Sequence, residues 1–93
     1  MTPMKLKYFA IYRDITRKKE EDLPAPSDIW TLLQNLGERY QGFGVKLFTP
    51  SGTEIGEDTI ILVNGRNVEH LDGKDTMLKE TDTVSIFPVV AGG

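Results

Sequence analysis

Hydrophobic and polar positions along the chain predict three strands and one helix. Residues 5–12 and 83–87 alternate large apolar side chains with polar ones, the period-two pattern of a strand with one buried face. Residues 59–63 form a short branched apolar run that also predicts a strand, closed by a tight turn at Asn64-Gly65. Between them, apolar side chains recur at the i, i+3, i+4, i+7 and i+11 spacing of an amphipathic helix: Ile29, Leu32, Leu33, Leu36 and Tyr40.

The secondary structure of the segments between these strands and the helix is predicted from their charges and turn-forming residues. Residues 13–22 carry mixed charges and are interpreted as a solvated second strand that forms a hairpin with the first. Ser27 is the expected N-cap of the helix, and Gly42 and Gly44 are the expected stop signals after it. Residues 45–59, which include a proline and two glycines, predict a short strand followed by a loop.

The order strand, strand, helix, strand, strand predicts an α+β fold of the β-grasp, or ubiquitin-like, type. In this arrangement a mixed sheet of four to five strands packs on one main helix. The first and last long strands are the expected central neighbours because both alternate large apolar side chains. Residues 1–87 are then expected to form a single domain, and residues 88–93 a flexible C-terminal tail.

Composition narrows the function classes. A net charge of −3 argues against nucleic acid as the main partner, because phosphate binding needs a net basic face. No apolar run approaches the roughly 20 residues of a membrane span, and the start shows no signal-peptide pattern, so no membrane and a cytoplasmic location are expected. The chain has no cysteine, which excludes disulfides, zinc thiolate sites and a cysteine nucleophile.

Residues with catalytic chemistry are scarce. The only histidine, His70, is interpreted as a polar loop residue, and Trp30, which lies off the helical stripe, as a partial lid on the core. Neither phosphate-binding glycine motifs nor the acidic spacing of a calcium loop is present. We therefore expect no active site of the chain's own, no bound metal and no bound cofactor.

The end of the chain is the most distinctive segment. Side chains shrink in steps along Pro88-Val89-Val90-Ala91-Gly92-Gly93, and six extended residues span roughly 20 Å. Glycines without side chains allow a backbone to pass through a narrow channel and leave the terminal carboxylate accessible. The residues alone leave two interpretations open: a tail that enters a partner's active site, or an ordinary frayed terminus.

The pattern Phe87-Pro88-x-Val90-x-Gly92-Gly93 resembles the ending of the MoaD/ThiS family of ubiquitin-like sulfur carriers, and most closely the MoaD small subunit of molybdopterin synthase. Leu6-Lys7-Tyr8-Phe9-Ala10 with Arg13-Asp14 is similar to the family's first strand, and Pro26-Ser27 to its helix start. Val89 departs from the pattern, since the molybdopterin-synthase subunit often has a second proline there. The loop 49–58 is longer than in compact thiamine-pathway members.

The resemblance implies a function for the tail. An E1-like enzyme would use ATP to adenylate the carboxylate of Gly93, with Gly92 and Ala91 giving access. Sulfur from a cysteine desulfurase or rhodanese-type donor would displace AMP, and the resulting thiocarboxylate would pass its sulfur to an acceptor such as the large molybdopterin synthase subunit. Molybdopterin biosynthesis is the expected pathway. The alternatives are a carrier for cysteine or thiamine biosynthesis, a protein modifier conjugated through Gly93, or a plain interaction module.

A partner-binding surface is predicted beside the tail. Period-two spacing in the first strand places Phe9 and Ile11 opposite a core face of Leu6, Tyr8, Ala10 and Tyr12. With apolar residues of the neighbouring strands and the tail, they are expected to form one exposed docking patch: Phe9, Ile11, Leu62, Phe87, Pro88, Val89 and Val90. The alternative is that a loop covers these residues.

Overall fold

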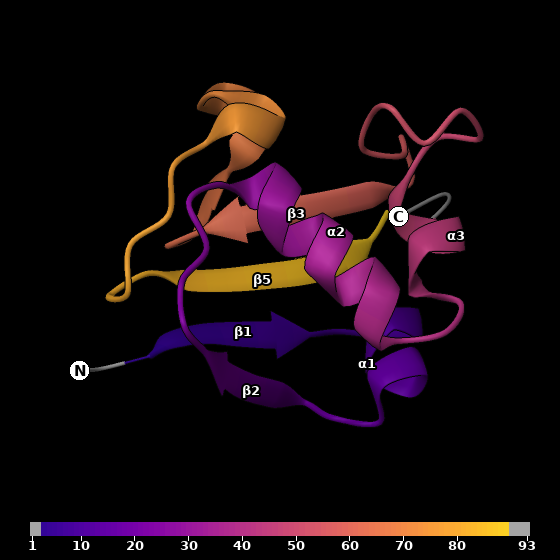
Figure 1. The fold of residues 1–93 in the computed structure, drawn as a ribbon, viewed down its shortest axis with the longest axis horizontal. Coiled ribbons are helices and arrows are strands. Elements are labelled where there is room, and N and C mark those ends of the chain that lie inside the picture. The colour runs from indigo at the N-terminus through magenta and orange to yellow at the C-terminus, as the bar shows by residue number, and fades with distance from the viewer. Residues whose placement is uncertain (1–2, 90–93) are drawn as a thin grey trace.

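A mixed five-stranded sheet lies at the centre of the computed structural model, which describes residues 3–89 (Figure 1). Strand order is β2-β1-β5-β3-β4, with β1 (Met4–Tyr8) parallel to β5 (Thr83–Pro88) and antiparallel to β2 (Glu20–Leu23). The remaining strands, β3 (Thr59–Val63) and β4 (Arg66–Asn67), continue the sheet by antiparallel pairing. The β-grasp prediction is confirmed, including the central pairing of the first and last strands.

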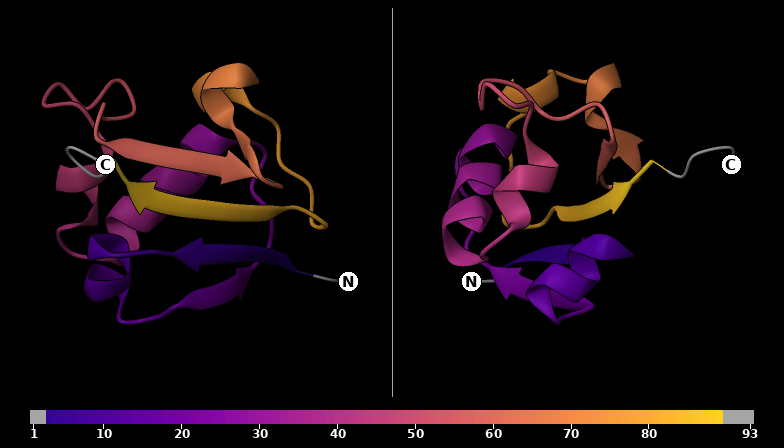
Figure 2. Two further views of the ribbon diagram at one scale, coloured as in Figure 1. Left: turned by 180° about the vertical axis from the view of Figure 1, so that it is seen from behind. Right: turned by 90° about the vertical axis from the view of Figure 1, so that its right-hand side faces the viewer.

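The long helix α2 (Ile29–Arg39) covers one face of the sheet together with the short helix α3 (Phe43–Leu47) (Figure 2). Alternate residues of the three central strands point toward α2, as the period-two pattern predicts. The core between the two layers consists of fully or almost fully buried side chains: Met4, Leu6, Tyr8, Ile29, Leu32, Leu33, Leu36, Phe43, Leu47, Ile61, Val63, Val84 and Ile86.

Helix α2 confirms the predicted amphipathic helix, but its N-cap is Asp28 and not Ser27. The Asp28 carboxylate accepts a hydrogen bond from the Thr31 N–H at 2.8 Å, which satisfies one of the unpaired donors of the first turn. The carbonyl of Ser27 instead accepts from the Leu78 N–H at 3.1 Å. Gly42 lies between α2 and α3 and has a φ of 89°, a conformation that glycine adopts without strain.

The prediction of a strand through Tyr12 is wrong. The strand ends at Tyr8, Ala10 turns the backbone with a φ of 52°, and helix α1 (Ile11–Thr16) follows. Tyr12 and Thr16 are four residues apart, so both fall on the helix face that is buried. Ala10 is exposed, and the predicted second strand is reduced to β2.

The short strand predicted at the start of residues 45–59 is also wrong. Helix α3 forms there because Phe43 and Leu47, again four residues apart, both enter the core. Gly44 therefore lies inside a helix and does not stop one. The only strand-like pairing among residues 48–58 is an isolated bridge between Phe48 and Ile55.

The second half of the chain follows the sequence pattern more closely. Asn64 and Gly65 both have positive φ values, as the predicted tight turn between β3 and β4 requires. Two short 3-10 helices, η1 (Val68–His70) and η2 (Gly73–Asp75), lead to β5. The last strand extends one residue beyond the predicted range and includes Pro88.

A partly buried carboxylate joins β2 to the helical layer. Glu21 accepts hydrogen bonds from the hydroxyls of Tyr8 at 2.5 Å and Tyr40 at 2.6 Å, and it pairs with Arg39 at 3.3 Å and Lys18 at 3.6 Å. Burial raises the pKa of the Glu21 carboxyl, but the two hydroxyls and the two cations outweigh burial and hold that pKa below its usual value. Ionised Glu21 therefore contributes to the stability of the fold.

Replacing Glu21 by Gln is expected to lower the free energy of unfolding at pH 7 by about 1–3 kcal/mol, because hydrogen bonds and ion pairs to a charged group are lost. A carboxyl with a depressed folded pKa stabilises above its unfolded pKa of about 4.3, and this contribution disappears as the pH falls through the folded pKa. The difference in the free energy of unfolding between wild type and E21Q should therefore shrink on acidification. Urea unfolding at several pH values would measure this difference.

Glu20→Gln is the matched control. The Glu20 side chain is about half exposed, and among residues 3–89 it pairs only with Lys5 at 3.2 Å, a surface contact worth about 0–1 kcal/mol. Equal stability losses for E20Q and E21Q at pH 7 would contradict the role assigned to the Glu21 cluster.

Candidate functional site

The end of β1 and the end of β5 lie at the same edge of the sheet because the two strands are parallel (Figure 1). Phe9 leaves β1 there, and its N–H donates to the carbonyl of Ile86 at 3.1 Å. Phe87 and Pro88 complete β5 at the same place, while Leu62 comes from the neighbouring strand β3. Residues far apart in the sequence are thus gathered beside the start of the tail.

An apolar hollow of about 450 Å³ lies on the sheet face opposite α2. We call it the apolar hollow; it is lined by Phe9, Ala10, Leu62, Ser85, Phe87 and Pro88. The rings of Phe9 and Phe87 meet edge to face with centroids 5.7 Å apart, a favourable aromatic arrangement. Phe9 remains 37% exposed, although a phenylalanine side chain is usually buried in a folded domain.

Four residues of the predicted docking patch are therefore brought together here: Phe9, Leu62, Phe87 and Pro88. Ile11 is not among them. It begins helix α1, so the strand parity that linked it to Phe9 does not hold, and it faces a second hollow instead.

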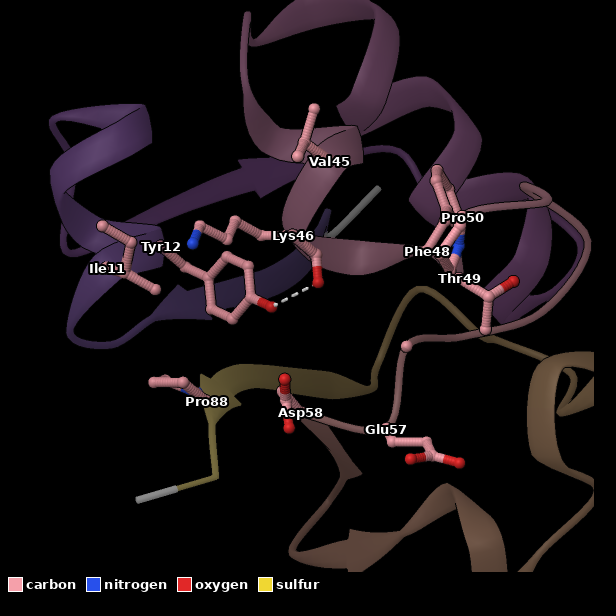
Figure 3. Close-up of a pocket in the computed structure, with 11 residues that line it drawn as sticks. Ile11, Tyr12, Val45, Lys46, Phe48, Thr49, Pro50, Glu57, Asp58 and Pro88 are labelled. Atoms are coloured by element: carbon pink, nitrogen blue, oxygen red, sulfur yellow. Dashed lines mark hydrogen bonds between the residues drawn. The ribbon is translucent and has the colours of Figure 1, made fainter. Parts of the chain in front are cut away.

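This second hollow, of about 830 Å³, lies between α1, α3 and the loop before β3 (Figure 3). We call it the mixed hollow because its lining combines apolar and charged side chains, among them Ile11, Val45, Lys46 and Asp58. Pro88 borders both hollows, so the start of the tail separates them. Val45 is 84% exposed, and its place in this hollow was not predicted because α3 itself was not predicted.

A buried pair of hydroxyls adjoins the mixed hollow, which Tyr12 lines. The hydroxyls of Tyr12 and Thr59 lie 2.5 Å apart, and Thr59 also donates to the carbonyl of Lys46 at 3.1 Å. Burial raises the pKa of the Tyr12 phenol, an effect that the nearby Asp58 charge reinforces and the Thr59 contact only partly opposes. Tyr12 is therefore a neutral positioning group that ties α1 to α3 and β3.

The tail starts from a fixed point. The N–H of Val89 donates to the carbonyl of Asp58 at 2.8 Å, which extends the pairing of β5 with β3 by one residue. The Val89 side chain is 47% exposed. Four predicted site residues, Val90, Ala91, Gly92 and Gly93, lie outside the described residues.

The remaining sequence candidates lie elsewhere. His70 is exposed in η1, and Trp30 packs against Phe48 with ring centroids 5.1 Å apart. Within residues 3–89, no cluster of three His, Cys, Asp or Glu side chains is arranged to hold a metal ion. No helix in that part of the chain has the length and hydropathy needed to span a membrane.

Known proteins resemble this chain along its whole length. Residues 6–93 match the ThiS family. The chain is 35% identical over 92 residues to the small archaeal modifier protein 3 of Haloferax volcanii, an alignment that covers 97% of this chain and 98% of that protein. It is 27% identical over 93 residues to the molybdopterin synthase sulfur carrier subunit of Emericella nidulans, with full coverage of both.

A solved structure shows the same fold. The solution structure of the small archaeal modifier protein 1 from Methanosarcina acetivorans superposes with a TM-score of 0.84 and 31% sequence identity. The match covers 100% of this chain and 98% of that one. The ubiquitin-like β-grasp is therefore the arrangement found in a protein of similar length and related sequence.

Val89→Pro should loosen the start of the tail, because proline has no N–H to donate to Asp58. We expect amide hydrogen exchange at Thr59, which directly follows Asp58, to become about fivefold faster, as the loss of one hydrogen bond worth about 1 kcal/mol implies. Val89→Ala retains the N–H and serves as the control. Equal exchange at Thr59 in V89P and V89A would show that this bond does not fix the segment.

Proposed function

The chain belongs to the ThiS family of ubiquitin-like sulfur carriers and modifiers, and we propose that it carries sulfur as a thiocarboxylate on Gly93. The observation that carries this proposal is the apolar hollow at the start of the tail. A partner that binds the hollow would hold Pro88 and receive the residues beyond it. The family match extends through residue 93, which includes the Gly92-Gly93 ending.

In the proposed reaction the Gly93 carboxylate first needs activation, because an ionised carboxylate resists nucleophilic attack and has no good leaving group. An E1-like enzyme supplies it: a carboxylate oxygen attacks the α-phosphate of ATP, pyrophosphate leaves, and an acyl-adenylate forms. A hydrosulfide-level nucleophile then attacks the carbonyl carbon. The C–S bond forms as the C–O bond to AMP breaks, and the thiocarboxylate remains.

The sulfur nucleophile comes from a partner in this proposal. A cysteine desulfurase or rhodanese-type donor presents a persulfide, and a thiol that cleaves its S–S bond releases the sulfur at the sulfide level. The chain itself has no cysteine, so no internal thiol competes for the acyl-adenylate. ATP is consumed by the activating enzyme, and the chain needs no cofactor of its own.

Docking is the part that the described residues would perform. Phe9, Leu62, Phe87 and Pro88 would provide the apolar contact, and Val89 and Val90 would continue it into the partner's channel. Ile11 would contribute from the mixed hollow on the other side of Pro88. Both the activating enzyme and the acceptor must take in the same tail, so we expect them to bind this surface in turn.

Molybdopterin biosynthesis is the pathway we propose for the sulfur, with the large molybdopterin synthase subunit as acceptor. Its support is the similarity over the full chain to the sulfur carrier subunit from Emericella nidulans. The higher identity to the modifier protein of Haloferax volcanii favours a second candidate, conjugation of Gly93 to lysines of other proteins. Both functions begin with the same adenylate.

Intact-protein mass spectrometry would test the proposal after incubation with ATP, the activating enzyme and a sulfur donor. We expect a mass shift equal to the replacement of one oxygen by sulfur, and no shift when Gly93 is deleted. Sulfur transfer that survives this deletion would contradict the role of the terminal carboxylate. Isopeptide-linked Gly-Gly remnants on other proteins, without a thiocarboxylate, would favour the modifier function instead.

Leu62→Glu should weaken docking, because a carboxylate in the apolar hollow must be desolvated when a partner binds. We expect the apparent KM of the activating enzyme for this chain to rise about tenfold or more, as for a central interface residue. Met77→Glu is the matched control: Met77 is 66% exposed and lies between η2 and β5, before the start of the strand whose other end borders the hollow. Equal KM values for L62E and M77E would contradict a docking role for the hollow.

A further inference from the structure

A concentration of positive charge lies where α1 turns into β2. We call Arg13, Arg17, Lys18 and Lys19 the basic turn; with Asp14 they line a shallow hollow of about 490 Å³, and all five are exposed. Four of the chain's 11 Lys and Arg residues are thus grouped with one of its 14 Asp and Glu residues. This is a local net positive surface on a chain whose net charge is −3.

The charges of this region are separated by the fold. In the sequence, residues 17–22 are a mixed run of three bases followed by three acids. In the structure the acids enter β2, where Glu20 pairs with Lys5 and Glu21 with Arg39 and Lys18. Within residues 3–89, Arg13, Arg17 and Lys19 have no carboxylate oxygen within 4.0 Å, so their charges face outward uncompensated.

The backbone that carries these charges is held in place. Thr16 is buried, and its hydroxyl donates to the carbonyl of Tyr12 at 3.0 Å and accepts from the N–H of Lys18 at 3.3 Å. Arg17 closes the helix in the left-handed region with a φ of 61°, and its N–H donates to the carbonyl of Arg13 at 2.7 Å. The cationic side chains therefore extend from a defined turn, so little ordering of the backbone is needed when they bind a partner.

The basic turn lies at the end of the molecule where the tail begins. Helix α1 packs against the ends of β1 and β5, and its first residue, Ile11, shares the mixed hollow with Pro88 (Figures 1 and 3). A protein that binds the apolar hollow and takes in the tail therefore approaches the basic turn at the rim of the same contact. Charges at a rim act mainly on the association rate and on its dependence on salt.

We infer that the basic turn docks a carboxylate-rich segment of the activating enzyme, the first protein that receives the tail. This inference rests on the proposed function for the identity of that protein, and on charge complementarity for its chemistry. Four cations on a chain of net negative charge are too few for a nucleic acid site, in which six to ten phosphates are commonly neutralised. They do suit a short acidic segment, whose attraction is local and orients the tail end of the molecule toward its partner.

The first test uses a probe that does not depend on the proposed function. A hexaglutamate peptide is titrated into the labelled full-length chain, and backbone amide shifts are followed by NMR at low and high salt. We expect shifts concentrated in residues 13–19 that disappear at high salt. Absence of shifts there, or tighter binding of a single-stranded oligonucleotide at the same residues, would overturn the inference.

The second test uses the activating enzyme. Arg17→Glu with Lys19→Glu should lower the association rate about tenfold at low ionic strength, and the difference should vanish at high salt. Arg66→Glu with Lys79→Glu makes the same change of charge at exposed sites away from α1 and should leave the rate close to wild type.

The two failures are distinguishable. If wild type is adenylated and both double variants associate equally, the inference fails while the proposed function stands. If wild type is never adenylated, the proposed function fails, and the peptide titration then decides whether the turn binds carboxylates.

Discussion

The parallel pairing of β1 with β5 is the constraint on which the rest of the molecule depends. It places Leu6 beside Val84 and Tyr8 beside Ile86, so the first and last strands share the centre of one core. Parallel strands end at the same edge of a sheet, and their connection must cross over through a helix. Helix α2 supplies that crossover. Phe9, which follows β1, and Pro88, the last residue of β5, therefore line one hollow although nearly the whole chain separates them.

This edge gathers three surfaces of different chemistry around one point. The apolar hollow, the mixed hollow and the basic turn all adjoin the ends of β1 and β5, and Pro88 borders the first two. The opposite end of the sheet carries tight turns and the segment that leads from η2 into β5 (Figure 2). Hydrogen bonds among Tyr12, Thr59 and the Lys46 carbonyl join α1, α3 and β3 at this end of the sheet, so part of its shape is built into the buried layer.

The sequence predicted the elements that bury a continuous stripe and missed the two short helices. Thr59–Val63 and Ile29–Arg39 have enough apolar residues in register to define their period. In each of α1 and α3 only two side chains are buried, Tyr12 with Thr16 and Phe43 with Leu47, and two points one turn apart do not specify a period. The residues of the predicted docking patch show the same dependence: Leu62 and Phe87 lie on regular strands, and Phe9 directly follows β1 and still lines the apolar hollow with them. Ile11 lies two residues further along, after the chain has turned at Ala10 into α1, so the strand period no longer places it.

Under the proposed function, the choice between sulfur carrier and protein modifier depends on which partner protein recognises the chain. In the proposed function, an acyl-adenylate on Gly93 would react with whichever nucleophile is delivered to it, a sulfur or a lysine amine, and the cysteine-free chain supplies no thiol of its own. The contribution we propose for the chain is the choice of the protein that holds its tail. An apolar hollow of this kind is a general contact, because it selects for shape and desolvation but not for charge. The charged rim selects among partners by repelling the wrong sign, and it is therefore the part of the surface best suited to decide where the tail is delivered.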